Sequence, residues 1–362
     1  MRLVLQPDED AAHASLLQTA PGAYEWWYFD ALSQDGEWAL TAIWFLGNPF
    51  SPYYRDSLRG RASNPYAHNA LFFALYKQGA LHAYHFTRFP EREIQADSVQ
   101  PACLRFGPNT LAWNGQAYHL HISDENANCR RVDADLWFQA PPLQPVDVPA
   151  RETDSRGDTH CWLPAAPVCG VSGQITLREH ANRGAERLRI DGLGYHDHNW
   201  GTLPFDAHIK DWYWGRASLG DEGKASGQGE AVLVYHVRYH NAPPVSHLLR
   251  FAGGRLTLHD PAALVRLERV RANGFLLPYA TRLRVQSGEV SAVFELGARL
   301  DSAPFYARTL CRATVSQGGR AAQGRGLAEY FKPRALGLPL VASATKARIV
   351  DHAHGDGGGS RG

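Results

Sequence analysis

The chain has 362 residues, of which 44% are hydrophobic and 20% charged, and its net charge is +1. This composition is typical of a globular protein, and the balanced charge provides no long-range field that would attract nucleic acid. No segment reaches the roughly 18 to 20 apolar residues of a membrane-spanning helix, and the N-terminus turns acidic before a signal peptide develops. We expect a cytoplasmic protein without a nucleic-acid partner, which touches a membrane from outside if its substrate is a lipid.

The first half of the chain consists of short β-prone segments separated by turn signals. Residues 23–32 are aromatic and lack a helical period, and Gly36 then marks a hairpin turn. Asn114 and Gly115 form the strongest hairpin signal in the chain. The strands predicted in this half are 23–32, 37–46, 70–77, 80–88, 111–113, 116–122 and 131–139.

The segments between these strands have loop character. Residues 47–69 form a connection long enough to suggest a lid or rim loop. Residues 141–149 are a Pro-rich connector, and residues 220–229 are a polar, Gly-rich loop. His119 and His121 alternate with apolar residues within a predicted strand, so we expect them to face solvent.

The second half repeats the pattern, and the whole chain has almost no sustained helical period. Its predicted strands are 173–180, 187–195, 210–217, 230–239, 246–251, 255–259, 280–286, 290–296, 309–315 and 326–331. Many short strands with regularly spaced turns predict an all-β fold, and there are more strands than one small barrel needs. We therefore predict two tandem β domains, residues 1–203 and 204–350, followed by a low-complexity, disordered tail at 351–362.

Five cysteines are spread along the chain, and no two of them form a C-x-x-C pair. This spacing argues against a zinc ribbon or a thioredoxin-type redox centre. Cys161 and Cys169 are candidates for a disulfide in an oxidising compartment, although separate buried thiols are the commoner arrangement.

Residues 191–216 concentrate titratable and aromatic side chains. His196, Asp197 and His198 are consecutive, and His208 and several Trp and Tyr residues follow. Four interpretations remain open for this stretch. The first is a buried polar network that stabilises a domain junction, and the second is a metal site built on His196 and His198. The third is a nucleophilic centre, and the fourth is an acid–base site for an apolar substrate. The nucleophilic interpretation is the weakest, because the chain has no G-x-S-x-G motif.

The acid–base interpretation rests on desolvation. A carboxyl group among Trp rings stays protonated when burial raises its pKa, and such a group donates a proton. Electron-rich rings then stabilise a carbocation by about 2 kcal/mol or more for each desolvated contact. Glu25 lies in a second aromatic run, shares a strand face with Trp27, and needs a partner, for which Arg216 is a candidate. Glu329 lies among apolar neighbours in a third run.

Five blocks in this order resemble the carotenoid 1,2-hydratase (hydroxyneurosporene synthase) family and its relatives in the wider lipocalin-like superfamily. The resemblance covers about residues 22–331. The blocks are Y-E-W-W-Y-F (24–29), H-C-W-L-P-A-A-P (160–167), G-Y-H-D-H-N-W-G (194–201), W-Y-W-G-R (212–216) and G-L-A-E-Y (326–330).

The resemblance implies two tandem lipocalin-like β-barrels and cofactor-independent addition of water across the terminal C1–C2 double bond of an acyclic carotenoid or related isoprenoid. Asp197 would donate the proton, His196 and His198 would tune it and orient the water, and Glu25 would receive the proton from the water. No metal is implied. The candidate substrate-binding residues are Trp27, Trp200, Trp212, Tyr213, Trp214 and Arg216.

Two alternatives to a hydratase stay open at this point. Relatives in the superfamily include cyclising enzymes, so a lipocalin-like cyclase or pericyclase acting on a polyketide or terpenoid is one of them. The other is a non-catalytic carrier, because an aromatic pocket also serves binding alone. A carrier has no need for a buried acid, which distinguishes it from a hydratase.

Overall fold

The structure is a computed structural model that describes residues 2–3, 19–59, 63–96, 103–126, 128, 130–140, 160–179, 184–220 and 229–352. The predicted connector at 141–149 lies outside these residues, as does most of the predicted loop at 220–229. The tail predicted from residue 351 lies outside them from residue 353 onward. Asp351 itself is in a short strand.

The described residues form two sheets, and the first is built from the strands up to Gly201 together with β22 near the C-terminus. Its order is β22-β5-β4-β3-β2-β12-β11-β10-β9-β8-β7-β6, and β1 pairs with β11 outside this path. The strands are β1 (Arg2–Leu3), β2 (Tyr24–Ser33), β3 (Trp38–Leu46), β4 (Asn69–Lys77), β5 (Ala80–Phe89), β6 (Ile94–Ala96), β7 (Cys103–Phe106), β8 (Asn109–Trp113), β9 (Ala117–Glu125), β10 (Arg131–Gln139), β11 (Cys161–Arg178), β12 (Glu186–Gly201) and β22 (Val350–Asp351).

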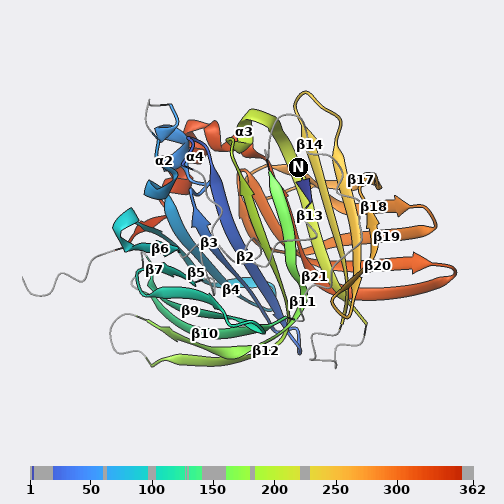
Figure 1. The fold of residues 1–362 in the computed structure, drawn as a ribbon, viewed down its shortest axis with the longest axis horizontal. Helices are drawn as coiled ribbons and strands as arrows, with labels where there is room; N and C mark the ends of the chain where they lie inside the picture. The colour runs from blue at the N-terminus through green and yellow to red at the C-terminus, as the bar shows by residue number, and fades with distance from the viewer. Residues whose placement is uncertain are drawn as a thin grey trace, which may run out of the picture.

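The second sheet follows in the chain and has the order β16-β15-β14-β13-β21-β20-β19-β18-β17. Figure 1 shows the two curled sheets side by side, the first in blue and green and the second in yellow and orange. The strands are β13 (Ile209–Leu219), β14 (Glu230–Tyr239), β15 (Val245–Ala252), β16 (Arg255–Asp260), β17 (Leu264–Ala272), β18 (Pro278–Ser287), β19 (Val290–Ala303), β20 (Tyr306–Gln317) and β21 (Arg320–Phe331).

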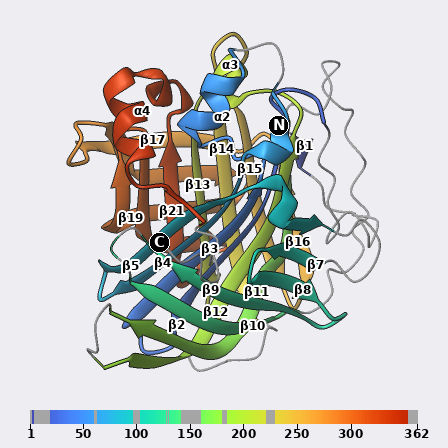
Figure 2. The same cartoon turned by 90° about the vertical axis from the view of Figure 1, so that its left-hand side faces the viewer.

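Helix is scarce and gathers at one end of the sheets, where α2, α3 and α4 lie together (Figures 1 and 2). The predicted loop at 47–69 contains two of the short helices. The helical segments are α2 (Pro52–Ser57), η1 (Pro65–Ala67), η2 (Glu91–Glu93), α3 (Phe205–His208), η3 (Pro333–Gly337) and α4 (Pro339–Lys346). Within the described part of the chain, no helix is both long and apolar enough to span a lipid bilayer.

The outer strands alternate between apolar and polar residues, because only one of their faces is covered. In β10, Val132, Leu136 and Phe138 are buried while their neighbours are not. His119 and His121 on β9 lie on the corresponding outer face and are partly exposed, as predicted.

The central strands are instead buried on both faces, which explains their continuous aromatic and apolar sequences. Each sheet encloses its own apolar core, and a third cluster fills the space between the two sheets. In β2, for example, Trp27 and Phe29 face the first core, whereas Trp26 and Tyr28 face the cluster between the sheets.

The predicted all-β fold is confirmed, and most predicted strands are present. The pattern missed β1, β6, β7, β17 and β22. It began β11 and β21 too late in the chain, and it ended β12 and β19 too early. The division into domains at residues 203 and 204 stays a prediction. The two sheets separate between Gly201 and Ile209, while β22 near the C-terminus pairs with β5 of the first sheet.

Candidate active site between the two sheets

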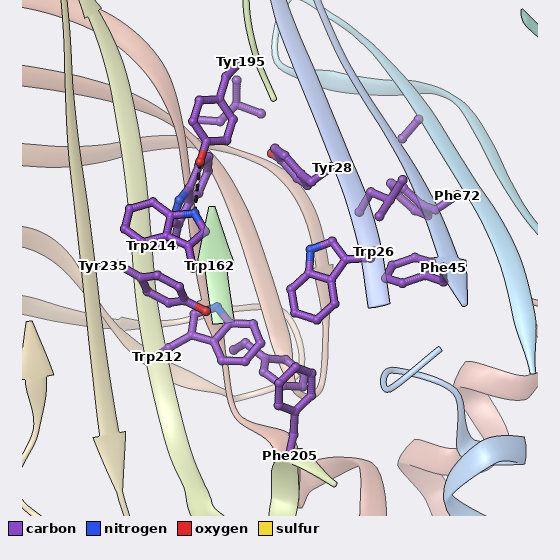
Figure 3. Packing of buried hydrophobic residues seen from close by; sticks show 14 of the residues in the cluster. Trp26, Tyr28, Phe45, Phe72, Trp162, Tyr195, Phe205, Trp212, Trp214 and Tyr235 are labelled. Carbon is purple, nitrogen blue, oxygen red and sulfur yellow. Dashed lines mark hydrogen bonds between the residues drawn. The ribbon is translucent and has the colours of Figure 1, made fainter. Parts of the chain in front are cut away.

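Aromatic rings from both sheets line the space between them. Trp26 and Tyr28 project from β2, and Trp212 and Trp214 project toward them from β13 (Figure 3). The ring centroids of Tyr28 and Trp214 are 5.4 Å apart in an edge-on arrangement. Strand alternation produces this wall, because residues two apart on each strand point to the same side.

A cavity of about 140 Å³ lies within this cluster. Its walls are mostly apolar, and α4 and the β17–β18 turn form part of its rim. An apolar molecule would therefore fit better than a polar one. Its lining residues include Trp26, Tyr28, Phe275, Asp301, Arg308, Glu329, Ala344 and Arg348.

A second, smaller cavity of about 30 Å³ is also lined by residues of both sheets. Four residues line both cavities, so the two spaces adjoin: Trp26, Tyr28, Trp212 and Glu329. Asp197, Asn199, Trp214 and Tyr235 complete the wall of the smaller one. The predicted carboxyl group therefore faces an aromatic cavity and not bulk solvent.

Asp197 is 5% exposed and is held by three donors. Its Oδ2 accepts hydrogen bonds from Trp162 Nε1 at 2.9 Å and from the Tyr195 hydroxyl at 2.8 Å. Its Oδ1 accepts one from Asn199 Nδ2 at 2.6 Å. These bonds fix the orientation of the carboxyl group relative to the small cavity.

Burial raises the pKa of Asp197 to about 8. The three donors act in the opposite direction, and the negative charge of Glu329 adds to the increase. Desolvation exceeds the hydrogen bonds, so the carboxyl group holds its proton at neutral pH. A neutral carboxylic acid beside a dry aromatic cavity is able to donate a proton to a weak base.

The two predicted histidine partners do not lie beside Asp197. On β12, Tyr195, Asp197 and Asn199 face the space between the sheets, and His196 and His198 face the core of the first sheet. The His196 ring stacks on Phe29 with centroids 4.0 Å apart. Adjacency in sequence therefore places these histidines on the opposite side of the strand.

Glu25 also faces the first core, where its Oε1 is 2.6 Å from His198 Nε2. The predicted pairing of Glu25 with Arg216 is wrong. Arg216 forms a buried ion pair with Asp30, which joins β13 of the second sheet to β2 of the first. Glu25 and Asp30 lie on opposite faces of β2, so Arg216 reaches Asp30 and not Glu25.

The predicted substrate-binding residues divide in the same way. Trp212 and Trp214 line the small cavity. Trp27 and Trp200 instead lie near the His198 ring, with centroids 4.6 Å and 5.0 Å from it. Tyr213 faces the core of the second sheet, where its hydroxyl oxygen accepts a hydrogen bond from Ala280 N at 2.8 Å.

Several residues of the site escaped the sequence argument. Tyr195 lies two positions from Asp197, so strand alternation alone would have identified it. Trp162 lies beside β12 through the pairing of β11 with β12, which pairs Trp162 with Asn199. Its only signal in the sequence was its place in the H-C-W-L-P block.

His160 is a further buried group at the edge of this site. Its Nδ1 is 3.0 Å from the Tyr24 hydroxyl, and its Nε2 is 2.8 Å from the hydroxyl of Tyr235, which lines the small cavity. Burial lowers the pKa of His160 well below the usual value, so the ring is neutral. A neutral imidazole between two phenols both donates and accepts a hydrogen bond.

A wider polar groove opens farther along the space between the sheets, and its volume is about 950 Å³. Arg216 lines this groove, and its partner Asp30 accepts a hydrogen bond from the Tyr28 hydroxyl at 3.0 Å. Because Tyr28 lines both aromatic cavities, the Asp30–Arg216 pair lies between them and the groove. The other charged residues of the groove are Arg282, Arg284, Glu295, Arg312 and Arg325.

The structure gives no group of three or more His, Cys, Asp or Glu side chains placed to hold a metal ion, as far as its described residues extend. Cys161 and Cys169 are separate buried thiols, so the candidate disulfide is not formed.

Comparisons with known proteins identify the relatives of this chain. A family model described as "Carotenoid hydratase CrtC" matches residues 42–346. The chain is 30% identical to "Hydroxyneurosporene dehydrogenase" of Chlorobaculum tepidum, over 91% of this chain and 88% of that protein. It is 32% identical to "Acyclic carotenoid 1,2-hydratase" of Thiocapsa roseopersicina, over 83% of this chain and 67% of that protein.

The fold is also similar to a solved structure. Kievitone hydratase from Nectria haematococca aligns over 87% of this chain and 90% of its own, with a TM-score of 0.53 and 12% identity. At this identity the likeness concerns the fold alone.

Proposed function

The chain belongs to the carotenoid hydratase CrtC family and is a hydratase-type enzyme, and on that premise we propose the reaction that it catalyses. It adds water across the terminal C1–C2 double bond of an acyclic carotenoid or related isoprenoid, by acid catalysis through a tertiary carbocation and without a cofactor. The proton goes to C2, the less substituted carbon, and water then bonds to C1.

One observation carries this proposal, which is the protonated, buried Asp197 at the wall of an aromatic cavity. An alkene is a very weak base, so its protonation needs an acid in a dry site. The pKa of about 8 keeps this acid loaded at neutral pH. A non-catalytic carrier would gain nothing from burying a carboxyl group, because burial of a polar group costs free energy.

The hydrogen bonds of Asp197 support its role as donor. Oδ2 accepts hydrogen bonds from both Trp162 and Tyr195, whereas Oδ1 accepts one, from Asn199, so we place the acidic hydrogen on Oδ1. After transfer, the same two donors stabilise the carboxylate. The site is therefore arranged for both protonation states of this one group.

Rings around the small cavity would shield the cation. Trp26, Tyr28, Trp212 and Trp214 line it. Each desolvated contact between a cation and a ring contributes about 2 kcal/mol. Tyr235, held by neutral His160, presents the polar edge of the cavity and would orient the attacking water.

We assign a structural role to the three predicted residues that face the core of the first sheet. Glu25, His196 and His198 face away from the cavity, so neither the proton transfer nor the water position is proposed for them. Their contacts hold β12 against β2, and this fixes the position of Asp197.

Incubation of the purified protein with lycopene or neurosporene tests this function. Mass spectrometry should detect a product that has gained one water, with the hydroxyl on C1. Prior dialysis against EDTA should leave the yield unchanged, because no cofactor takes part. A folded protein that leaves both polyenes and shorter acyclic isoprenoids unaltered would contradict the proposal.

We also propose that the rim of the larger cavity contacts a membrane, from which an apolar substrate enters. Phe275 lines this cavity, and its neighbour Leu276 is 84% exposed. Leu340 is 85% exposed and lies one helical turn before Ala344, which also lines the cavity. Replacement of Leu276 and Leu340 by Ser should reduce co-sedimentation with lipid vesicles, and unchanged sedimentation would contradict this contact.

A further inference from the structure

Glu329 lies where the two aromatic cavities adjoin. It is on β21, and its side chain is 13% exposed. It lines the small cavity together with Asp197 and also lines the larger one. In the described structure, Asp197 and Glu329 are the two acidic residues that line the small cavity.

Arg308 holds Glu329 in place. Its Nε donates to Glu329 Oε1 at 3.0 Å, and its Nη1 donates to the Tyr76 hydroxyl at 3.1 Å. The Arg308 residue is 2% exposed. A buried ion pair beside an apolar cavity costs desolvation free energy and gains little from an apolar ligand. The position of the Arg308–Glu329 pair beside the cavity is therefore better explained by a reaction in which charge develops than by binding of an apolar ligand alone.

The two carboxyl groups of the small cavity have opposite environments. Asp197 has only neutral donors, whereas Glu329 has a guanidinium group at hydrogen-bond distance. Pairs of acidic groups in contrasting environments are typical of an acid and a base that work together. Asp197 is suited to give a proton, and Glu329 is suited to accept one.

We propose that Glu329 is the general base of the hydration reaction, positioned by Arg308. This inference rests on the proposed function. Asp197 transfers its proton to C2, and the π electrons form the new C2–H bond, which leaves a cation at C1. A lone pair of water forms the C1–O bond, and the bound water passes one proton to the Glu329 carboxylate. The sum of these steps is the addition of one water.

The cycle closes when the proton returns from Glu329 to Asp197. The small cavity of about 30 Å³ exceeds the roughly 10 to 15 Å³ that one water needs. A water there would relay the proton between the two carboxyl groups. The raised pKa of Asp197, which burial causes, favours return of the proton to this group.

The simpler alternative is that Asp197 both donates the proton and takes it back. Formate and azide distinguish a mechanism in which Glu329 is the base from one in which Asp197 takes the proton back. Formate is a base that can replace a missing carboxylate. Azide is a nucleophile that captures a carbocation without having to lose a proton, so it needs no base. In Glu329→Ala, the guanidinium of Arg308 would attract either anion.

The experiment uses the full chain with lycopene as substrate, with and without formate or azide. In Glu329→Ala, hydration should fall about 100-fold or more, as expected for loss of a general base. Formate should restore hydration at least about tenfold, and azide should yield an adduct that has gained HN₃. Asp197→Asn should give neither product, because the cation never forms.

Asp301→Ala is the matched control. Asp301 lines only the larger of the two cavities and is ion-paired with Arg348 at 3.4 Å, so its removal also exposes a guanidinium to the cavity. This variant should keep the wild-type ratio of azide adduct to alcohol. If alanine at position 329 prevents folding, Glu329→Gln keeps the side-chain volume and should show the same loss of hydration.

Two results would overturn the assignment of Glu329. One is hydration at the wild-type rate in Glu329→Ala or Glu329→Gln. The other is a loss of hydration in Glu329→Ala that neither anion relieves, because it would place the defect before the cation. A wild-type protein that hydrates neither lycopene nor neurosporene nor a shorter acyclic isoprenoid would instead contradict the proposed function itself.

Discussion

The two faces of β12 carry similar residue types but differ in what surrounds them. On one face, His196 and His198 contact Phe29, Trp27 and Glu25 within the core of the first sheet. On the other face, Asp197 borders a cavity. The comparison teaches that consecutive titratable residues on a strand divide between two faces, and that here Asp197 lines the small cavity whereas His196 and His198 do not.

Of the substitutions on the two faces of β12, Asp197→Asn should have the largest effect on turnover. We expect turnover to fall by about 10³-fold or more, because the amide cannot donate the proton. The protein should fold, since asparagine has the same shape and the Asn199 amide can rotate to keep the hydrogen bonds. Product formation under saturating substrate, with circular dichroism as the folding control, measures this. Turnover within a few-fold of wild type would remove Asp197 from the mechanism.

Glu25→Gln should have the opposite signature on the other face. It leaves His198 without its carboxylate, and breaking a buried pair of this kind costs about 3 to 5 kcal/mol when the pair is ionised. The free energy of unfolding should decrease accordingly in urea titration, while turnover per folded molecule stays close to wild type. A selective loss of turnover at unchanged stability would return Glu25 to the catalytic set.

The pH dependence of the hydration rate is a smaller effect, and it tests whether Asp197 holds its proton on the cavity face of β12. Above a pH of about 8 Asp197 loses its proton, so the rate should fall about tenfold for each further pH unit. The folded state holds this proton up to about pH 8, whereas the unfolded chain releases it near pH 4. Between these values the free energy of unfolding contributed by this group therefore decreases as the pH rises.

This stability effect has its own control. Asp197→Asn carries no titrating proton at this position, so the decrease between about pH 4 and 8 should be absent from its unfolding curves. Equal pH dependence in the two proteins would show that the carboxyl group is not held neutral in the folded state.

Much of the fold could be predicted from local patterns. The period-two alternation of β10 and the turn at Asn114 and Gly115 depend only on neighbouring residues, and both are present. The first half of β11 was missed because it contains Pro164 and Pro167, which normally argue against a strand. The pairing of β11 with β12 shifts register in this region, and the irregularity accommodates both prolines.

The site was predictable only in part for a related reason. Asp197 and Trp214 stand out in the sequence because polar and aromatic residues crowd there. The contacts of Asp197 with Trp162 and of Glu329 with Arg308 depend on which strands pair, and a single sequence does not encode this in any local pattern. Strand alternation puts His196 and His198 on the face of β12 opposite to Asp197, so the roles that the resemblance implies for these histidines conflict with the period of the strand.

The Asp30–Arg216 pair has a consequence for long substrates. The pair lies beyond Tyr28, between the aromatic cavities and the groove, so the proposed polyene substrate would enter with one terminus leading and stop before the pair. A symmetric polyene with two reactive ends would then be converted one end at a time, with release and reversal between the two events. Singly hydroxylated molecules should accumulate first, and the doubly hydroxylated form should follow only after a second visit.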